Sequence, residues 1–560
     1  MRERLAITTD KDGCAPQGQC GCCTVLVDGE ARVSCVTPAA RIAGRSITTL
    51  VGLAPEVREP LADAFVNTGG SQCGFCTPGI LLRLAALQAK AKTSPADVER
   101  ALAAHLCRCT GWQTITEAAT TCFDPAQFRD LLSGRGQKHN PADKKSRNWE
   151  AAGRRAEMEG GVAQFVGRRA PLGDAGFADD TAPRDALVAI PCPPGSPADT
   201  VSAGGIAWVI GESLAAARTA AGKVQGRRTT VADEPPLPLP ALPAGGVRLV
   251  TGWVEPAYLE PDASWCAPAC VPASTLANGG AFGGKAASVA PAAARELADA
   301  FGRTVRTVFA REDVVRLGPK RPPIAATAVA HDGRIVLRGV AADAFPAVPT
   351  PYAVELDVQW NHESVNGPPV SSALRAVGLA EQTVLVEGAI EAAGWDRQVL
   401  LAHDPRAAAV LLDTVAMSVS GAVAGARVDI NADSGAVESV HVRVDAGDPL
   451  DEIVLRSYVI GAVHMALGWV LTEGLTVDPE RGEVLDLTIR SFGIIRPKAM
   501  PPVTVEVVSS DDGEPARAGA SDATFAAVAA AAWNAVTTAD GLRPEAFPAK
   551  DTRAARMLRR

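Results

Sequence analysis

The sequence predicts an α+β protein made of several domains. Its 560 residues are too many for one hydrophobic core, so the chain should divide into three or four units. Short alternating strands come first, helical periodicity follows up to about residue 121, and mixed α/β sequence fills the rest. The 47% hydrophobic and 21% charged residues are ordinary for a globular chain and support packed domains.

The overall charge and hydropathy exclude some functions. A net charge of −8 disfavours a nucleic-acid surface, because such a surface needs a concentrated basic face. No run of 18 apolar residues is present, and this predicts that no segment spans a membrane. The first ten residues lack the apolar stretch that a signal peptide needs. We therefore expect a cytoplasmic protein.

The first part of the chain carries clear local signals. Residues 24–27 alternate and then turn at Asp28-Gly29, which predicts a β-hairpin. Apolar residues recur at helical spacing over 80–91. Ser94 is a helix N-cap residue followed by a first-turn proline and an acid, so a second helix should cover 98–106.

The remainder alternates predicted strands and helices. The polar, basic stretch 134–147 is typical of an exposed linker. After it, a buried strand leads into an Ala-rich helix, a second helix leads into a second strand, and one helix lies near the end. These elements are expected at 206–210, 213–224, 292–301, 305–310 and 524–536.

Nine of the thirteen cysteines lie between Cys14 and Cys109, and this crowding favours metal binding over a disulfide framework. The first group contains four candidate ligands and one extra thiol, Cys22, among glycines 13, 18 and 21. A Gly-rich loop lets backbone N–H groups wrap closely around a cluster. The spacing resembles the plant-type [2Fe-2S] pattern, except that the first gap is one residue longer and predicts a bulge. The candidate ligands are Cys14, Cys20, Cys23 and Cys35.

The second group consists of two close pairs of thiols. Cys73 and Cys76 form one pair, and Cys107 and Cys109 form the other. Each pair should lie at a helix end, where the dipole and free N–H groups favour a thiolate. Spacing alone leaves two alternatives, a structural zinc site and an iron-sulfur cluster.

Three motifs around these cysteines resemble one family. Gly13-Cys-Ala-Pro-Gln-Gly-Gln-Cys-Gly-Cys-Cys-Thr-Val, Gln72-Cys-Gly-Phe-Cys-Thr-Pro-Gly and Cys107-Arg-Cys-Thr-Gly-Trp look like the xanthine dehydrogenase/aldehyde oxidase family of molybdenum hydroxylases. The resemblance implies two [2Fe-2S] clusters bound by the eight cysteines named above. It also implies a division into an N-terminally short, β-grasp plant-type ferredoxin domain (1–57), a four-helix-bundle [2Fe-2S] domain (58–125), a linker (126–150) and a shortened, mixed α/β molybdopterin-binding part in two regions (151–400 and 401–560).

The resemblance continues more weakly into the later chain. A Gly-rich loop around Phe282 and a segment containing Arg375 look like parts of the family's molybdenum domain. By resemblance, Arg375 is a candidate catalytic residue. The implied molybdopterin-binding residues are Gln72, Gly279, Gly280, Phe282 and Gly283. Simpler roles remain open: Arg375 as an ion-pair partner at a helix start, Phe282 as a core residue, and Glu260 as a turn acid.

Three departures from the family pattern concern the molybdenum site. About one hundred residues that include a cofactor-binding Gly-Gln-Gly loop are missing after Leu401. Ser521 stands where the family has the Glu that acts as general base, and the adjacent Asp522 is the other catalytic candidate. Tyr458 stands where the family has a Gln.

Two functions follow as alternatives. The chain is an oxidoreductase of this type that passes electrons through two [2Fe-2S] clusters, or it is a non-catalytic electron-transfer or scaffold subunit whose molybdenum site has been lost. No FAD domain is recognisable, so the resemblance implies a partner subunit that holds FAD or another redox group. Molybdopterin is a doubtful cofactor here, and a small-molecule substrate is expected only if its site is intact. The thiols expected to be structural are Cys22, Cys192, Cys266 and Cys270.

Overall fold

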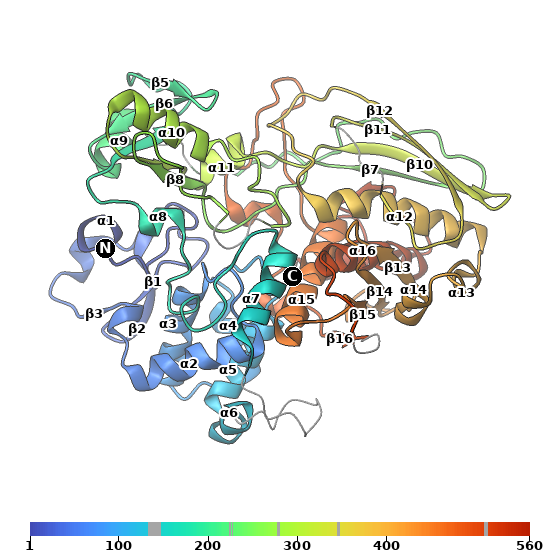
Figure 1. Cartoon of the computed structure of the whole chain (residues 1–560), viewed down its shortest axis with the longest axis horizontal. Coiled ribbons are helices and arrows are strands. Elements are labelled where there is room, and N and C mark those ends of the chain that lie inside the picture. Colours follow the sequence, from blue (N-terminus) through green and yellow to red (C-terminus); the bar gives the residue numbers. More distant parts are fainter. Residues whose placement is uncertain are drawn as a thin grey trace.

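The N-terminal and C-terminal parts of the chain form the two sides of the molecule seen in Figure 1. This computed structural model describes residues 1–132, 147–222, 226, 228–276, 281–343, 348–508 and 513–559. The N-terminal elements, drawn in blue, lie at the lower left, and the strands β10–β12 lie at the upper right. The stretch expected as a linker, 134–147, lies outside the described residues except for Arg147.

A small antiparallel sheet begins the fold. Strand β1 (Thr24–Val27) pairs with β2 (Glu30–Val33) on one side and with β3 (Ile47–Thr48) on the other. The predicted hairpin is confirmed: Asp28 and Gly29 have φ angles of 49° and 81°, as a two-residue turn of type I′ requires. One-turn helix α1 (Arg2–Leu5) precedes the sheet.

Helices follow the sheet and pack against one another. Ser94 caps α4 as expected, because its side chain accepts a hydrogen bond from the Asp97 N–H at 3.2 Å. The predicted helix over 98–106 is shorter in the structure and ends at Leu102, before the second pair of cysteine ligands. The helices are α2 (Pro55–Thr68), α3 (Thr77–Gln88), α4 (Pro95–Leu102), α5 (Gln113–Phe123), α6 (Pro125–Leu132) and, after the gap, α7 (Trp149–Gly160) and α8 (Ala178–Thr181).

A five-stranded sheet with the order β5-β6-β4-β9-β8 forms the next layer. Its strand and helix elements agree with the four sequence predictions between 206 and 310. The strands are β4 (Leu187–Pro191), β5 (Val201–Ala203), β6 (Ile206–Gly211), β8 (Ala263–Cys266) and β9 (Val305–Val308), with helices α9 (Leu214–Ala221), α10 (Ala290–Phe301) and α11 (Arg311–Leu317).

Two further sheets share one large core. Their orders are β12-β11-β10-β7-β17 and β13-β14-β15-β16. The strands are β7 (Val247–Thr251), β10 (Ile324–His331), β11 (Arg334–Ala341), β12 (Glu355–His362), β13 (Thr414–Met417), β14 (Val423–Ile430), β15 (Val437–Asp445), β16 (Val503–Val507) and β17 (Ala546–Phe547). The helices are α12 (Arg375–Ala393), α13 (Arg397–Leu400), α14 (Pro405–Val410), α15 (Glu452–Leu471), α16 (Ala520–Asp540) and α17 (Arg553–Leu558).

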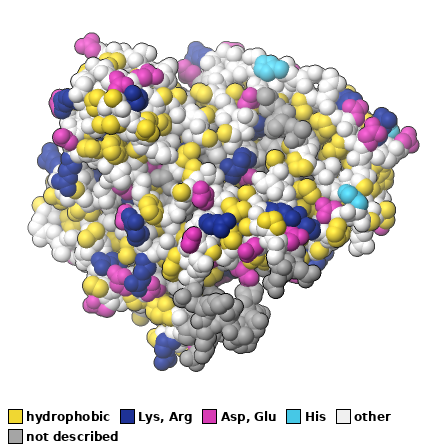
Figure 2. All heavy atoms as spheres, in the orientation of Figure 1, with side chains coloured by type: hydrophobic (Ala, Val, Ile, Leu, Met, Phe, Trp, Pro, Cys, Tyr) yellow, Lys and Arg dark blue, Asp and Glu magenta, His cyan; other side chains and the backbone are white. Residues whose placement is uncertain are grey.

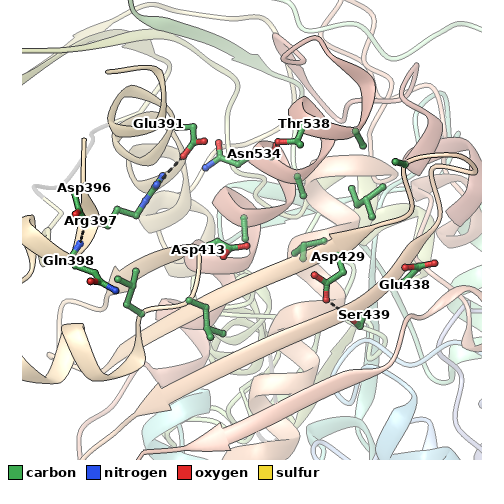
Figure 3. A pocket seen from close by; sticks show the side chains of 18 of the residues that line it. Glu391, Asp396, Arg397, Gln398, Asp413, Asp429, Glu438, Ser439, Asn534 and Thr538 are labelled. Atoms are coloured by element: carbon green, nitrogen blue, oxygen red, sulfur yellow. Dashed lines mark hydrogen bonds and ion pairs between the residues drawn. The ribbon is translucent and has the colours of Figure 1, made fainter. Parts of the chain in front are cut away.

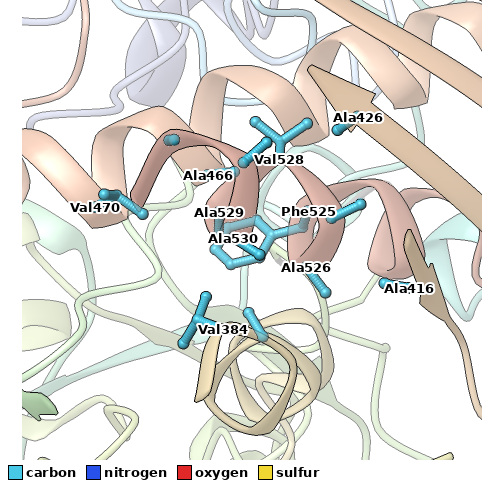
Figure 4. Packing of buried hydrophobic residues seen from close by; sticks show 14 of the residues in the cluster. Val384, Ala416, Ala426, Ala466, Val470, Phe525, Ala526, Val528, Ala529 and Ala530 are labelled. Carbon is cyan, nitrogen blue, oxygen red and sulfur yellow. The ribbon is translucent and has the colours of Figure 1, made fainter. Parts of the chain in front are cut away.

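Helix α16 is the centre of this core. It packs against α12, α15 and strand β14, and residues 520–533 are buried along its whole circumference. Figure 4 shows Phe525, Val528 and Ala529 among side chains from the neighbouring elements. Alanine leaves little bulk on the helix surface, so the surrounding elements can approach α16 from every side.

Helix α15 connects the core to the N-terminal region. Among the described residues it is the single helix long and apolar enough to cross a membrane, and 83% of its most apolar window is buried. Such burial is typical of a core helix. Ser457 near its start donates a hydrogen bond to the Gly69 carbonyl, and Arg456 pairs with Glu117.

The surface carries charges of both signs. Lys and Arg side chains alternate with Asp and Glu over the face drawn in Figure 2.

Candidate functional site

The first group of cysteines is gathered beside strand β1. Cys14 and Cys20 are each 1% exposed, Cys23 is also buried, and Cys35 is partly exposed. Hydrogen bonds from Cys20 and Cys35 hold the pKa of Cys14 far below its usual range, and Cys35 lowers the pKa of Cys23 in the same way. Cys14 therefore contacts Cys20 and Cys35, and Cys35 contacts Cys23, although three of these thiols precede β1 and Cys35 lies in the 3-10 turn Ser34–Val36 after β2.

Backbone N–H groups point at one of these sulfur atoms. The Gln17 and Gln19 amides donate to the Cys14 sulfur at 3.3 and 3.4 Å. Hydrogen bonds of this kind to thiolates are typical of iron-sulfur sites and help to set their potentials. Cys22 is fully buried between the ligands, and its sulfur lies against the Cys20 carbonyl at 3.9 Å.

The second group joins two segments around helix ends. Cys76 is the N-cap residue of α3, and Cys107 and Cys109 lie in the loop before α5. The Cys73 and Cys109 sulfur atoms are 3.5 Å apart. A hydrogen bond from Cys76 lowers the pKa of Cys107 to about 7. The sulfurs thus lie in two pairs, Cys73 with Cys109 and Cys76 with Cys107. Each pair takes one sulfur from each of the two segments.

Pairing of the sulfurs distinguishes between the two metals left open by the sequence. A tetrahedral zinc site brings all four ligands around one ion. In a [2Fe-2S] cluster each of the two irons takes two protein ligands. In the second group the close sulfur contacts are Cys73 with Cys109 and Cys76 with Cys107. The paired thiols fit the dinuclear cluster.

The two cysteine groups are in direct contact through backbone. The Leu106 N–H, next to Cys107, donates to the Cys20 carbonyl at 2.9 Å. An added Cβ on Gly79 would lie 2.4 Å from the Gly21 carbonyl, so glycine is required where α3 meets the first loop. One hydrogen bond therefore links the ligand loops of the two groups.

The residues expected to hold molybdopterin are separated or covered. Gln72 donates to the Cys109 carbonyl and to the Ser457 hydroxyl, both at 2.9 Å. Phe282 packs against Phe525 with ring centroids 5.8 Å apart, as expected of a core residue. An added Cβ on Gly283 would lie 2.2 Å from the Ala373 carbonyl. The remaining two, Gly279 and Gly280, lie outside the described residues.

The two catalytic candidates bind each other. Arg375 begins α12, and its Nε donates to Asp522 at 3.0 Å. Burial raises the pKa of Asp522 to about 6, against the opposing effect of Arg375, and the nearby Glu159 raises it further. Arg375 also donates to the Glu159 carbonyl at 3.0 Å. The simpler role, an ion-pair partner at a helix start, accounts for all of these contacts.

Ser521 donates hydrogen bonds to a carboxylate from a distant part of the chain. Its amide and its hydroxyl donate to Glu159 Oε2 at 2.8 and 2.7 Å. Glu159 is 1% exposed and belongs to α7. No sequence pattern predicts this contact, because Glu159 and Ser521 are 362 positions apart.

Tyr458 likewise has a partner from the segment after α7. Its hydroxyl donates to the Gln164 side-chain carbonyl at 2.8 Å. A cavity of only about 20 Å³ lies between Gln164, Tyr458 and Gln72, which is room for a single water molecule. The described side chains beside Gln72 therefore leave no room for a bound pterin at that position.

A large cleft lies elsewhere among the described residues. It measures about 1000 Å³ between α12, β14 and α16 (Figure 3). Asp413, Asp429 and Glu438 give it acidic walls, and none of the predicted site residues lines it. The candidate site is therefore not this cleft.

Other residues singled out from the sequence have structural surroundings. Glu260 is not a plain turn acid: it is buried and pairs with Lys285 at 2.6 Å. The Cys266 sulfur contacts the Cys270 carbonyl at 3.1 Å. Neither thiol lies near the two cysteine groups, in agreement with a structural role.

Comparison with known proteins agrees with this geometry. A [2Fe-2S] binding domain model matches residues 49–120, and a molybdopterin cofactor-binding domain model matches residues 274–501. The xanthine dehydrogenase iron-sulfur-binding subunit of Escherichia coli O157:H7 is 43% identical over 126 residues, which are 22% of this chain and 78% of that protein. The nicotine 6-hydroxylase small subunit of Paenarthrobacter nicotinovorans is 44% identical over 119 residues, which are 21% of this chain and 72% of that protein.

The fold is similar over the whole chain to a solved enzyme structure. The aldehyde oxidoreductase from Desulfovibrio gigas aligns with a TM-score of 0.71 at 16% identity, over 100% of this chain and 97% of that chain. Fold and cysteine sites together define an oxidoreductase with a [2Fe-2S] binding domain and a molybdopterin-type domain. Within this class, the chain belongs to the xanthine dehydrogenase/aldehyde oxidoreductase family.

Proposed function

We propose that this chain is a two-cluster electron carrier of its family. Cys73, Cys76, Cys107 and Cys109 hold one [2Fe-2S] cluster, and Cys14, Cys20, Cys23 and Cys35 hold the other. The observation that carries the proposal is the pairing of sulfur atoms, seen most directly in the 3.5 Å separation of the partly buried Cys73 and Cys109. Each cluster takes up one electron, so the chain moves electrons singly.

Electrons would pass between the clusters through the shared backbone contact. The hydrogen bond from Leu106 to the Cys20 carbonyl is a short connection between ligands of different clusters. Cys35 is the ligand of the first cluster that reaches the surface, and the neighbouring Val36 is 53% exposed. A redox partner subunit, holding FAD or another redox group, would exchange electrons at this face.

The finer description of the domains belongs to the same proposal. We assign a β-grasp ferredoxin domain to 1–57, a four-helix-bundle cluster domain to 58–125, a linker to 126–150 and a molybdopterin-domain-like part to 151–400 and 401–560. Helices α2 to α5 packed around the second cysteine group support the bundle. Most of helix α6 and the first two residues of α7 lie within the segment assigned as the linker, so its described part is largely helical.

Molybdenum hydroxylation is the second candidate function. The molybdopterin-binding model that matches 274–501 favours it. A bound molybdopterin would supply the metal centre at which substrate is oxidised. The surroundings of Gln72, Phe282 and Arg375 do not fit that cofactor, so the electron carrier is the better supported function.

Metal analysis and EPR of anaerobically purified protein test the proposal. We expect about four irons per chain and two distinguishable signals after reduction, one from each [2Fe-2S] cluster. Cys109→Ala should halve the iron and remove one signal. Cys122→Ala is the matched control, because Cys122 is a buried thiol in α5 that lies outside both groups. Iron near zero in the unsubstituted protein, or two unchanged signals in Cys109→Ala, would refute the assignment.

A further inference from the structure

Helix α7 and the turn that follows it contact residues that the sequence connects with the molybdenum site. The helix lies beside α15 near the middle of the molecule (Figure 1). Its contacts extend to Arg375, Tyr458 and Ser521, three positions that the sequence connects with the molybdenum site. The same turn lines the 20 Å³ cavity next to Gln72.

Hydrogen bonds and an ion pair hold the buried Glu159 carboxylate in a defined position. Burying a carboxylate is costly unless hydrogen bonds and a counter-charge compensate for the lost water. Glu159 has both: two hydrogen bonds from Ser521, a third from the Ala520 amide at 3.3 Å, and an ion pair with Arg155 at 3.2 Å. These amides are the free N–H groups at the start of α16, where the helix dipole also favours an anion.

Arg155 lies one turn before Glu159 on the same inner face of α7. It is fully buried, and it donates to the backbone carbonyls of Asp448, Pro449 and Arg517 at 2.6, 3.0 and 2.8 Å. With Glu159 these contacts satisfy the charged groups on the inner face of the helix. The opposite face carries Glu157, which is exposed.

The turn after α7 completes the contact. Gln164 accepts from Tyr458 and donates to the Ala156 carbonyl at 3.3 Å. An added Cβ on Gly160 would lie 1.8 Å from the Gln164 side-chain nitrogen, so the glycine allows this side chain to fold back. Ser521 and Tyr458 are the two positions where the expected Glu and Gln are absent. They are also the two that receive a Glu and a Gln from residues 148–167.

We propose that residues 148–167 form a resident plug that takes the place of the pterin in this chain. Asn148 starts the plug by capping α7, and Glu159 and Gln164 supply the polar groups that Ser521 and Tyr458 bind. The inference rests on the proposed function, because it makes the chain a carrier that holds two iron-sulfur clusters and no molybdopterin. A glutamate at 521 would meet Glu159 at the same helix start, so the plug and the family's base exclude each other.

The first test measures iron, molybdenum and pterin in the full-length protein made in a host that loads molybdopterin into its own enzymes. The plug predicts about four irons per chain from two [2Fe-2S] clusters, with pterin at background. Pterin approaching one per chain would overturn the plug and leave the electron-carrier proposal standing. Iron near zero would overturn the electron-carrier proposal, and the plug proposal with it.

The second test uses hydrogen exchange to measure whether Glu159 protects the backbone amides at the start of α16. Glu159→Gln should speed hydrogen exchange at the Ala520 and Ser521 amides about tenfold or more, because charge-assisted hydrogen bonds are weakened. Glu157→Gln, on the exposed face of the same helix, should leave that exchange unchanged. Equal exchange in the two variants would overturn the proposal.

Exchanging the residues at positions 159 and 521 provides a further test if Glu159→Gln fails to fold. Ser521→Glu alone should lower the thermal midpoint of the iron-loaded protein, because two carboxylates then share one buried position. Adding Glu159→Ser should recover most of that loss by restoring one carboxylate and one hydroxyl. A double variant no more stable than Ser521→Glu would overturn the proposal.

Discussion

The buried imidazole of His464 makes stability depend on pH at the level of one residue. His464 is 0% exposed, and burial lowers its pKa to about 4, helped by the charge of Arg108. In the unfolded chain the imidazole takes up a proton near pH 6.5. Between these values the unfolded state binds the proton that the folded state lacks. The free energy of unfolding therefore falls as the pH is lowered from 6.5 towards 4, by about 3 kcal/mol in total.

Replacing His464 by leucine tests this dependence. The Ile495 carbonyl, which contacts the imidazole, also accepts a hydrogen bond from Trp112 at 3.0 Å, so it keeps a partner in the variant. His464→Leu should flatten the decline of the thermal midpoint between pH 7 and 5. His403→Gln, at an exposed histidine, should retain the decline. A slope that is the same in all three proteins would contradict the assignment to His464.

Residue-level prediction from sequence worked where chemistry is concentrated in short motifs. The sequence predicts a metal site at Cys73, Cys76, Cys107 and Cys109, because metal ligands need fixed residue types at close spacing. Glu159 is different, because a single glutamate on an amphipathic helix has no pattern that separates it from a solvated acid. Its role depends on the distant start of α16, which only the folded chain brings near.

At the level of elements, helix α15 meets the second cysteine group through a glycine. An added Cβ on Gly461 would lie 1.8 Å from the Cys109 carbonyl, which real structures do not allow. Gly461→Ala should therefore push α15 and the ligand loop apart, although alanine suits the helix itself. We expect the iron content to fall by half and one of two reduced-cluster EPR signals to disappear.

Gly378→Ala is the matched control for this prediction. Gly378 also lies inside a long buried helix, but its added Cβ would meet only the Arg321 side chain, at 3.8 Å. The control should retain both signals and full iron. Two intact signals in Gly461→Ala would mean that the ligand loop does not depend on α15.

Elements with local signals were predictable, and those defined by long-range contacts were less so. The hairpin at Asp28-Gly29 and the Ser94 cap follow from backbone preferences within a few residues. The end of α4 at Leu102 was not predicted: Ala103 and Ala104 are exposed, and the chain then turns inwards at His105 and Leu106, before Cys107. Helix α7 was also missed, because its sequence fell into a stretch expected to be linker and general α/β chain.

At the level of the whole molecule, the N-terminal region is held to the core by buried polar contacts. Arg108, between Cys107 and Cys109, forms a bidentate pair with Glu473 at 2.5 and 2.7 Å, and both side chains are more than 90% buried. Trp112 donates to the Ile495 carbonyl, and Gln113 is bonded to Val503 in both directions. These noncovalent contacts should therefore hold the N-terminal region against the core even when the chain between α6 and α7 is cut.

A chain made as two fragments, 1–139 and 140–560, should therefore assemble when both are expressed together. The relatives from Escherichia coli and Paenarthrobacter nicotinovorans are named as subunits, an iron-sulfur-binding subunit and a small subunit, and each matches only about a fifth of this chain. Size-exclusion chromatography should give one particle containing both fragments and about four irons, the content of two [2Fe-2S] clusters.

The Arg108–Glu473 pair decides how tightly the two fragments bind. Arg108→Met leaves a buried carboxylate without its partner, which costs about 3–5 kcal/mol and should weaken fragment association by at least about a hundredfold. Arg100→Met is the control, because Arg100 is 74% exposed and its pair with Asp97 lies on the surface of one fragment, where it contributes about 0–1 kcal/mol. Fragments that separate without any substitution would show that the linker holds the molecule together. Equal association in the Arg108 and Arg100 variants would show that the buried pair does not hold the cluster domain to the core.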